Sequence, residues 1–170
     1  LRRMIDDAVE TRSDDPSPLY TVGTSEGQFT LRSAKSLIEE SPEVQWQVDG
    51  ILAEGASMLL AGEAGLGKTF LMLDLALAID RGRPWLGHFA VKSGKVLIVD
   101  EENADRLIRR RLKKLLLSEG EPDNGSTLGI QFMTQQGLNL SDPKHVEQLK
   151  TVLGECLPSL VIIDSLVRVH

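Results

Sequence analysis

The sequence predicts a parallel α/β sheet with helices on both faces, from two observations. First, short apolar runs at 57–61, 95–99, 130–133 and 160–164 alternate with longer segments of helical character. Continuous apolar strands in that order are typical of a parallel sheet that is covered on both sides. Second, a glycine-containing loop at 62–69 joins the first run to the first helix, which gives a strand–loop–helix unit.

Composition and length indicate one globular core preceded by a less ordered segment. The chain has 170 residues, of which 41% are hydrophobic and 26% charged. We expect residues 1–41 to form a weakly structured N-terminal segment, weakest up to about residue 28, with a polar linker at 13–18 and a short helix at 32–40. Residues 42–170 form the α/β core. The chain ends directly after an apolar strand, so we expect the core to be incomplete at its C-terminus.

The bulk properties exclude several classes of protein. A formal charge of -6 argues against a protein that coats nucleic acid. No apolar run reaches about 18 residues, so we expect no transmembrane helix and no membrane partner, and the acidic start does not resemble a signal peptide. The single cysteine, Cys156, excludes an internal disulfide, suits a cytoplasmic location, and is best interpreted as core filler on a helix.

Each helix is supported by its own composition. Leu, Met and Ala without a breaker predict a helix over 69–80, which Gly82 and Pro84 end. An apolar stripe at helical spacing predicts a helix over 104–118. Ser-Asp-Pro at 141–143 caps a further helix that extends to about residue 153.

Two other segments carry expectations about the core. The segment at 46–52 leads into it, and 54–55 turn before the first strand. In the loop 83–94, the side chains of Trp85, Leu86 and Phe89 are expected to pack down on the core rather than to contact a base.

The loop at 62–69 has the pattern G-x-x-x-x-G-K-T, which is typical of phosphate binding. Its glycines let successive backbone N–H groups point at a β-phosphate, and the positive end of the following helix adds to them. Lys68 is expected to reach the β- and γ-phosphates, and the Thr69 hydroxyl to ligate Mg²⁺. The predicted nucleotide-contacting residues of this segment are Gly62, Glu63, Ala64, Gly65, Leu66, Gly67, Lys68, Thr69 and Phe70.

Acidic residues follow two of the predicted strands. Asp164 ends the fourth strand, where the carboxyl ends of parallel strands open into a ligand crevice, and it is expected to hold a water of the Mg²⁺ shell. Asp100, Glu101 and Glu102 end the second strand. A carboxylate there is placed to polarise an attacking water. The alternative is an acidic helix start that the helix dipole favours, and at least two of the three acids are expected to be capping or solvated.

Three blocks of the sequence, at 62–69, 96–104 and 160–165, together resemble RecA-like ATPases, and more closely the AAA-ATPase branch related to the hexameric replicative helicase RepA. In that branch Trp-x-Val-x-Gly-x-Leu precedes the first strand, as at 46–52, and Arg-Arg-Leu follows on the helix after the acidic residues, as at 110–112. The resemblance covers about residues 42–170 and implies a RecA-like P-loop fold with a mostly parallel sheet.

The resemblance also implies roles for individual residues. The catalytic glutamate of such ATPases closes the second strand; Glu102 is the best match and Glu101 the second. Lys68 and Asp164 complete the catalytic set. An aromatic or arginine side chain after the glutamate stacks on adenine in relatives, a role that Arg109 or Arg111 is placed to take. The family pattern further implies a polar sensor residue and an arginine finger, which we assign to no residue here.

The predicted function is ATP binding and Mg²⁺-dependent ATP hydrolysis that drives DNA handling, as in a helicase or a mobile-element ATPase. Single-stranded DNA and a homo-oligomer, such as a hexameric ring, are partners that only the resemblance implies. The basic run at 109–114 is better explained as an exposed helix face than as a DNA contact. Two alternatives stay open: a nucleotide-binding regulator that does not hydrolyse ATP, and a P-loop small-molecule kinase.

Overall fold

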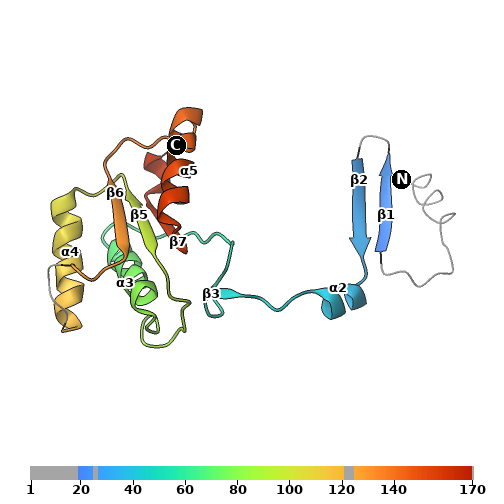
Figure 1. The fold of residues 1–170 in the computed structure, drawn as a ribbon, viewed down its shortest axis with the longest axis horizontal. Helices are drawn as coiled ribbons and strands as arrows, with labels where there is room; N and C mark the ends of the chain where they lie inside the picture. Colours follow the sequence, from blue (N-terminus) through green and yellow to red (C-terminus); the bar gives the residue numbers. More distant parts are fainter. Residues whose placement is uncertain (1–18, 25–26, 121–124, 170) are drawn as a thin grey trace. The chain divides into compact units, whose positions relative to one another are not determined.

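The structure is a computed structural model that describes residues 19–24, 27–120 and 125–169 (Figure 1). The chain divides into two compact units, Leu1–Glu43 and Val44–His170, and each is described by itself. The second unit carries the residues predicted to form the site.

The N-terminal unit holds a hairpin and a short helix. Strands β1 (Leu19–Thr24) and β2 (Gly27–Arg32) pair antiparallel. Helix α2 (Ala34–Glu40) follows, and the Ser33 hydroxyl caps it by accepting a hydrogen bond from the Ser36 backbone N–H at 3.1 Å. The short helix is therefore confirmed.

The weak structure expected up to about residue 28 is wrong for the described part of that segment. Residues 19–24 and 27–32 form strands because Tyr20 and Val22 on one strand, and Phe29 and Leu31 on the other, alternate with polar or small residues. Such period-two alternation predicts strands, but the polar residues before and between the two segments favoured a weakly structured segment instead. The predicted linker at 13–18 lies outside the described residues.

The second unit contains a three-stranded parallel sheet in the order β6-β5-β7. The central strand, β5 (Val96–Asp100), pairs with β6 (Ile130–Thr134) on one side and with β7 (Leu160–Asp164) on the other. The register places Asp100 opposite both Thr134 and Asp164, so the three carboxyl ends meet at one edge. The predicted α/β class is confirmed.

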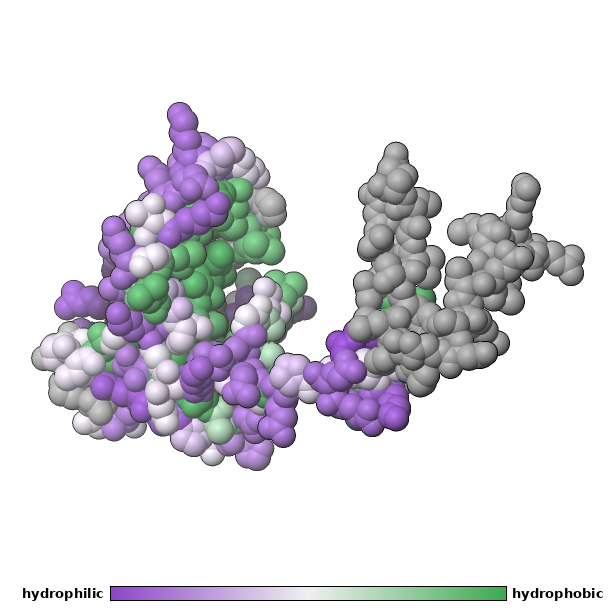
Figure 2. Space-filling model, turned by 45° about the vertical axis from the view of Figure 1, so that its right-hand side comes forward, coloured by the Kyte–Doolittle hydropathy of each residue, from purple (hydrophilic) through white to green (hydrophobic). Residues whose placement is uncertain are grey.

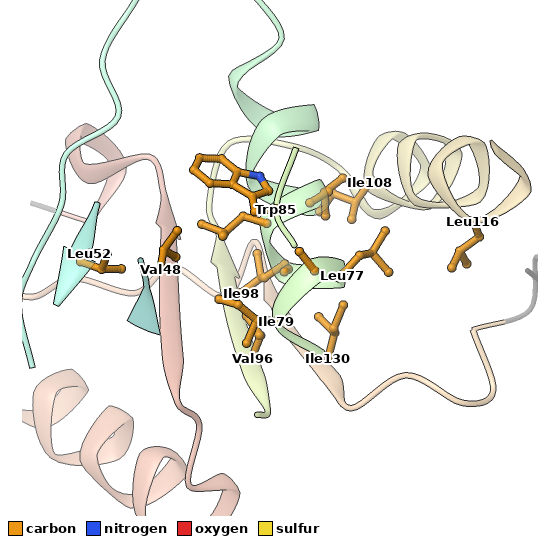
Figure 3. Packing of buried hydrophobic residues seen from close by; sticks show 14 residues of the cluster. Val48, Leu52, Leu77, Ile79, Trp85, Val96, Ile98, Ile108, Leu116 and Ile130 are labelled. Atoms are coloured by element: carbon orange, nitrogen blue, oxygen red, sulfur yellow. The ribbon is translucent and has the colours of Figure 1, made fainter. Parts of the chain in front are cut away.

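Helices cover both faces of this sheet (Figure 1). On one face, Val96 and Ile98 of β5 pack with buried residues of α3 (Lys68–Arg81) and α4 (Asp105–Ser118), as Figure 3 shows. On the other face, Leu97 and Val99 pack in a cluster that includes residues of α5 (Pro143–Cys156). All five residues of β5 are buried, which explains why the four residues before Asp100 are continuously apolar rather than alternating.

Local signals fix where the helices begin and end. Gly82 ends α3 in a left-handed conformation, φ 65°, which glycine adopts without strain. The Asp142 carboxylate caps α5 by accepting from the Lys144 N–H at 2.8 Å, and Pro143 occupies the first turn. Cys156 lies buried on α5, as predicted.

The buried strand predicted at 57–61 is wrong. These residues form no strand, and Met58, Leu59 and Leu60 are 46%, 75% and 39% exposed. An apolar run of strand length becomes a strand only when a neighbouring edge accepts its backbone hydrogen bonds. In the described residues β7 forms one edge of the sheet, and the segment 57–61 is not paired with it.

The segment before this run and the loop after α3 depart from expectation in smaller ways. Residues 46–53 form a small antiparallel pair, β3 (Trp46–Val48) and β4 (Leu52–Ala53), with Val48 and Leu52 in the core. In the loop, Trp85 is buried and Phe89 packs against the core, as predicted. Leu86 is instead 56% exposed, because it turns the chain with φ 52° while residues 85 and 89 pair across it.

The surface of the second unit mixes hydrophilic residues with a hydrophobic area that Figure 2 shows on one side. Among its most exposed large apolar side chains are Leu59 and, in the loop 62–69, Leu66 at 70%. Searched over the described residues, no helix is both long and apolar enough to cross a membrane.

Candidate functional site

The loop 62–67 leads into the N-terminus of α3. Gly65 and Gly67 both have φ +84°, a conformation that side chains other than glycine rarely adopt, and Gly67 is the N-cap residue. The loop residues are exposed. The turn therefore leaves the helix N-terminus and its free N–H groups open to an anion from solvent.

Lys68 is the first residue of α3, and its side chain folds back over the loop. Its Nζ donates to the carbonyl oxygens of Gly62 and Glu63, at 2.8 Å each. An ammonium group has three donors, so one N–H is left for a further acceptor. Ala64 and Leu66 have no polar side-chain group, and the Glu63 carboxylate accepts no hydrogen bond from the residues that the structure describes. These three residues therefore offer a ligand the loop backbone.

Thr69 and Asp164 lie far apart in sequence but meet in space. The Thr69 hydroxyl donates to Asp164 Oδ2 at 3.2 Å. Both predicted metal ligands thus present oxygen atoms at the same point, where β7 ends and α3 begins. Mg²⁺ prefers oxygen ligands and keeps several waters, so a hydroxyl and one carboxylate fit it. No group of three or more His, Cys, Asp or Glu residues suited to a metal occurs among the described residues.

The electrostatics of this point favour an added cation. Burial raises the pKa of the Asp164 carboxyl, and the nearby charge of Asp100 raises it further. The hydrogen bond from Thr69 and the charge of Arg111 act in the opposite direction without overcoming these effects. A cation beside Asp164 would offset the repulsion between the two carboxylates.

Asp100 shapes the loop that follows β5. Its side chain is 1% exposed, and its Oδ1 accepts the backbone N–H of Glu102 at 3.0 Å and of Asn103 at 2.6 Å. A buried carboxylate needs such partners. The three acids that ended the predicted strand therefore have different surroundings, and Asp100 belongs to the structure of the loop.

Glu101 and Glu102 differ in what their carboxylates contact. The Glu101 carboxylate accepts three backbone N–H groups of the loop after β6, from Gln136 (3.2 Å), Gly137 (3.0 Å) and Leu138 (3.0 Å). The Glu102 side chain is exposed and accepts no hydrogen bond from any residue that the structure describes. Glu101 fastens a neighbouring loop, and Glu102 is free to contact a ligand.

Arg111 reaches the acidic end of the site through Asn103. The Arg111 Nη1 donates to Asn103 Oδ1 at 2.9 Å, and its guanidinium lies 5.9 Å from the centre of the Phe70 ring. The other arginine considered for adenine, Arg109, is exposed and lines a hollow of ≈ 660 Å³ between α4 and β6. The structure thus brings Arg111 and Phe70 together with the loop that carries Glu102.

The sequence did not predict the hydrogen bonds by which Asp100 and Asn103 organise the site. The Asn103 amide donates to Asp100 Oδ2 at 3.0 Å and to Asp164 Oδ2 at 3.3 Å. The signal was in the sequence: an Asp at a strand end followed three residues later by Asn is a turn-forming pattern. Nothing local to the sequence indicates that Asn103 would also meet Asp164, because that contact depends on the pairing of β5 with β7.

The sheet, the loop before α3 and the acidic strand ends define a P-loop nucleotide-binding protein of RecA-like α/β fold. A family model described as AAA domain matches residues 24–170, and the chain belongs to this family. No curated protein and no solved structure matches the chain. Family membership indicates nucleotide binding by an AAA-type domain.

Proposed function

We propose that the protein binds Mg²⁺-ATP on the loop 62–69 and hydrolyses it. The observation that carries this proposal is the contact between Thr69, at the N-terminus of α3, and Asp164, at the end of β7. This contact supports the proposal because it brings the N-terminus of α3 and a carboxylate at a strand end to one point. The proposed contacts of the nucleotide are those named from the sequence: the loop backbone, Lys68, Thr69, Phe70 and Arg111.

Each side chain has a distinct part in this proposal. Lys68 keeps its two bonds to the loop carbonyls and directs its third N–H at a phosphate oxygen. Thr69 and Asp164 hold Mg²⁺, which neutralises charge on the β- and γ-phosphates. Glu102, whose carboxylate accepts no hydrogen bond from the described residues, orients and polarises the attacking water. Glu101 is unsuited to this part because its oxygens already accept three N–H groups.

The base is proposed to lie against Arg111 and Phe70. Both side chains present a flat face, and they already lie within contact range of each other. Phe70 is 36% exposed, so an aromatic surface is open to a ligand beside the loop. A guanidinium plane and an aromatic ring are both suited to stacking on adenine.

The use of ATP for DNA handling is proposed from the resemblance to the RepA-related branch. A helicase-type motor in a homo-oligomeric ring would need a second subunit to complete the site, because an arginine finger raises turnover by roughly 10³–10⁵. On α4, Arg106, Arg109 and Arg110 are exposed, although an exposed helix face is by itself a sufficient reason for these charges.

Phosphate release from Mg²⁺-ATP, with and without single-stranded DNA, tests the proposal. We expect free phosphate, a higher rate with DNA, and loss of ATP binding in Lys68→Ala. A phosphorylated acceptor in place of free phosphate would identify a kinase instead. ATP binding with no turnover, unchanged by DNA and by Glu102→Gln, would identify a regulator.

A further inference from the structure

The side chain of Asn103 lies at the centre of a network that joins two parts of the site. Its amide nitrogen faces the carboxylates of Asp100 and Asp164, at 3.0 Å and 3.3 Å for the closest oxygens. Its amide oxygen faces Arg111 at 2.9 Å. One short side chain therefore touches the strand ends of β5 and β7 and the middle of α4.

The chemistry of the partners fixes the orientation of this amide. Ionised carboxylates only accept hydrogen bonds, and a guanidinium only donates them. The nitrogen must therefore face Asp100 and Asp164, and the oxygen must face Arg111. Neither Asp nor Leu of similar shape can satisfy both sides, since the first lacks donors and the second lacks both kinds of group.

The network also sets the position of Arg111. Its guanidinium lies half-buried between Asn103 on one side and the Phe70 ring on the other. A long arginine side chain has much rotamer freedom to lose, so a fixed acceptor lowers the cost of holding it in one place. Asn103 is that acceptor.

We propose that Asn103 is a positioning residue that couples the magnesium-binding carboxylates to the base-contacting arginine. This inference rests on the proposed function, since it assumes that the loop 62–69 binds a nucleotide. In this proposal the Asn103 amide holds Arg111 at a fixed position relative to Asp164. Contact between Arg111 and the base therefore depends on a side chain that touches neither phosphate nor base.

Equilibrium binding of two probes in the presence of Mg²⁺ tests this: ATP, and inorganic tripolyphosphate, which has no base. Five proteins are compared: the wild type, Asn103→Ala, Arg111→Ala, the double variant and a control. Asn103→Ala keeps the backbone N–H that bonds Asp100, so only the amide is removed. Asn139→Ala, which removes an exposed amide from the loop after β6, is the control.

We expect Asn103→Ala to weaken ATP by about tenfold, as the loss of one guanidinium contact would. Tripolyphosphate affinity should change by less than about twofold, because the loop and Lys68 are untouched. The double variant should bind ATP no worse than Arg111→Ala alone, since the two residues act as one unit. Asn139→Ala should bind both probes as the wild type does.

Three results would overturn the inference: unchanged ATP affinity in Asn103→Ala, equal loss of both probes, or additive losses in the double variant. Tripolyphosphate binding also reports on folding, and Asn103→Ser, whose hydroxyl is too short to reach Arg111, replaces Asn103→Ala if that variant does not fold. A wild type that binds neither probe would contradict the proposed function itself, and the inference with it.

Discussion

The two loops that form the candidate site are built in opposite ways. The loop after β5 is fastened from several sides: Asp100 accepts two of its backbone N–H groups, and Glu101 bonds the loop after β6. The segment 57–67 before α3 is exposed: Lys68 donates to two of its carbonyls, and the carbonyl of Gly67 accepts the Leu71 N–H in the first turn of the helix. One half of the site is held by the protein, and the other half is open.

This difference follows from what each half must contact. Carboxylates at the ends of buried strands repel one another and need fixed donors, so the protein supplies them. Backbone N–H groups at a helix N-terminus are satisfied by the anion that binds there, so they stay exposed without a ligand. We therefore expect substitutions in the open loop to affect phosphate binding, and substitutions in the fastened loop to affect turnover, stability or, at Asn103, contact with the base.

The largest expected effect is that of Lys68→Ala in the open loop. Removal of the ammonium should weaken Mg²⁺-ATP by about 100-fold or more, since a preorganised charge facing phosphate is lost. Calorimetric titration with ATP measures the loss, and the thermal midpoint should stay near the wild-type value because Lys68 contacts only loop carbonyls. Lys150→Ala, which removes an exposed lysine on α5, should bind normally. If Lys68→Ala bound Mg²⁺-ATP with wild-type affinity, the loop 62–69 would not be the phosphate-binding site.

Next comes the pair of glutamates in the fastened loop. Glu102→Gln should lower phosphate release by about 100-fold or more while ATP still binds, as expected for loss of a general base. Glu101→Gln should instead destabilise the fold by about 1–3 kcal/mol, because an amide N–H₂ would face backbone donors. Turnover and thermal midpoints of both variants separate the two roles. Loss of turnover in Glu101→Gln together with loss of stability in Glu102→Gln would mean that the two roles are reversed.

A smaller effect concerns pH and Asp164. Its raised pKa means that the folded protein holds the proton more tightly than the unfolded chain. Without Mg²⁺, stability should therefore fall as pH rises from the ordinary carboxyl pKa through the raised one. Asp164→Asn should flatten this dependence and be at least as stable as the wild type at neutral pH in chelator, and added Mg²⁺ should stabilise the wild type only. A variant less stable than the wild type in chelator contradicts the repulsion described above.

The smallest expected effect lies outside both loops. Asp142→Ala removes the N-cap of α5 and should cost about 1 kcal/mol, or a few degrees in the thermal midpoint. ATP affinity and turnover should not change, since α5 contributes no residue to the candidate site. A change in binding would mean that the fastened and open loops are not the whole of the site.

The fold could be predicted where the sequence signal is local. Strands β5 and β7 each have four consecutive apolar residues before an Asp, β6 is apolar at three of its five positions, and α3 and α5 carry clear ends at Gly82 and Pro143. The run at 57–61 is also mostly apolar, yet it forms no strand. Pairing is a property of the neighbouring edge, and the composition of one segment does not report it.

The candidate site was predictable to the same extent. The pattern around Lys68 and Thr69 predicts phosphate binding by itself, and the position of Asp164 at a strand end predicts that it faces the same ligand. The contact between Thr69 and Asp164 could therefore be expected. The different surroundings of Glu101 and Glu102 could not be, because three N–H groups from a loop 35 to 37 residues away decide them. The bridging role of Asn103 depends on the same long-range pairing.

Hydrogen exchange of the backbone, with and without Mg²⁺-ATP, tests the difference between the two loops most directly. The amides of Glu102 and Asn103 donate to the buried Asp100 carboxylate, so they should exchange slowly without ligand and change little with it. The amides of residues 62–67 should exchange fast without ligand and slow markedly when Mg²⁺-ATP binds. Fast exchange at 62–67 that saturating Mg²⁺-ATP leaves unchanged would contradict the account.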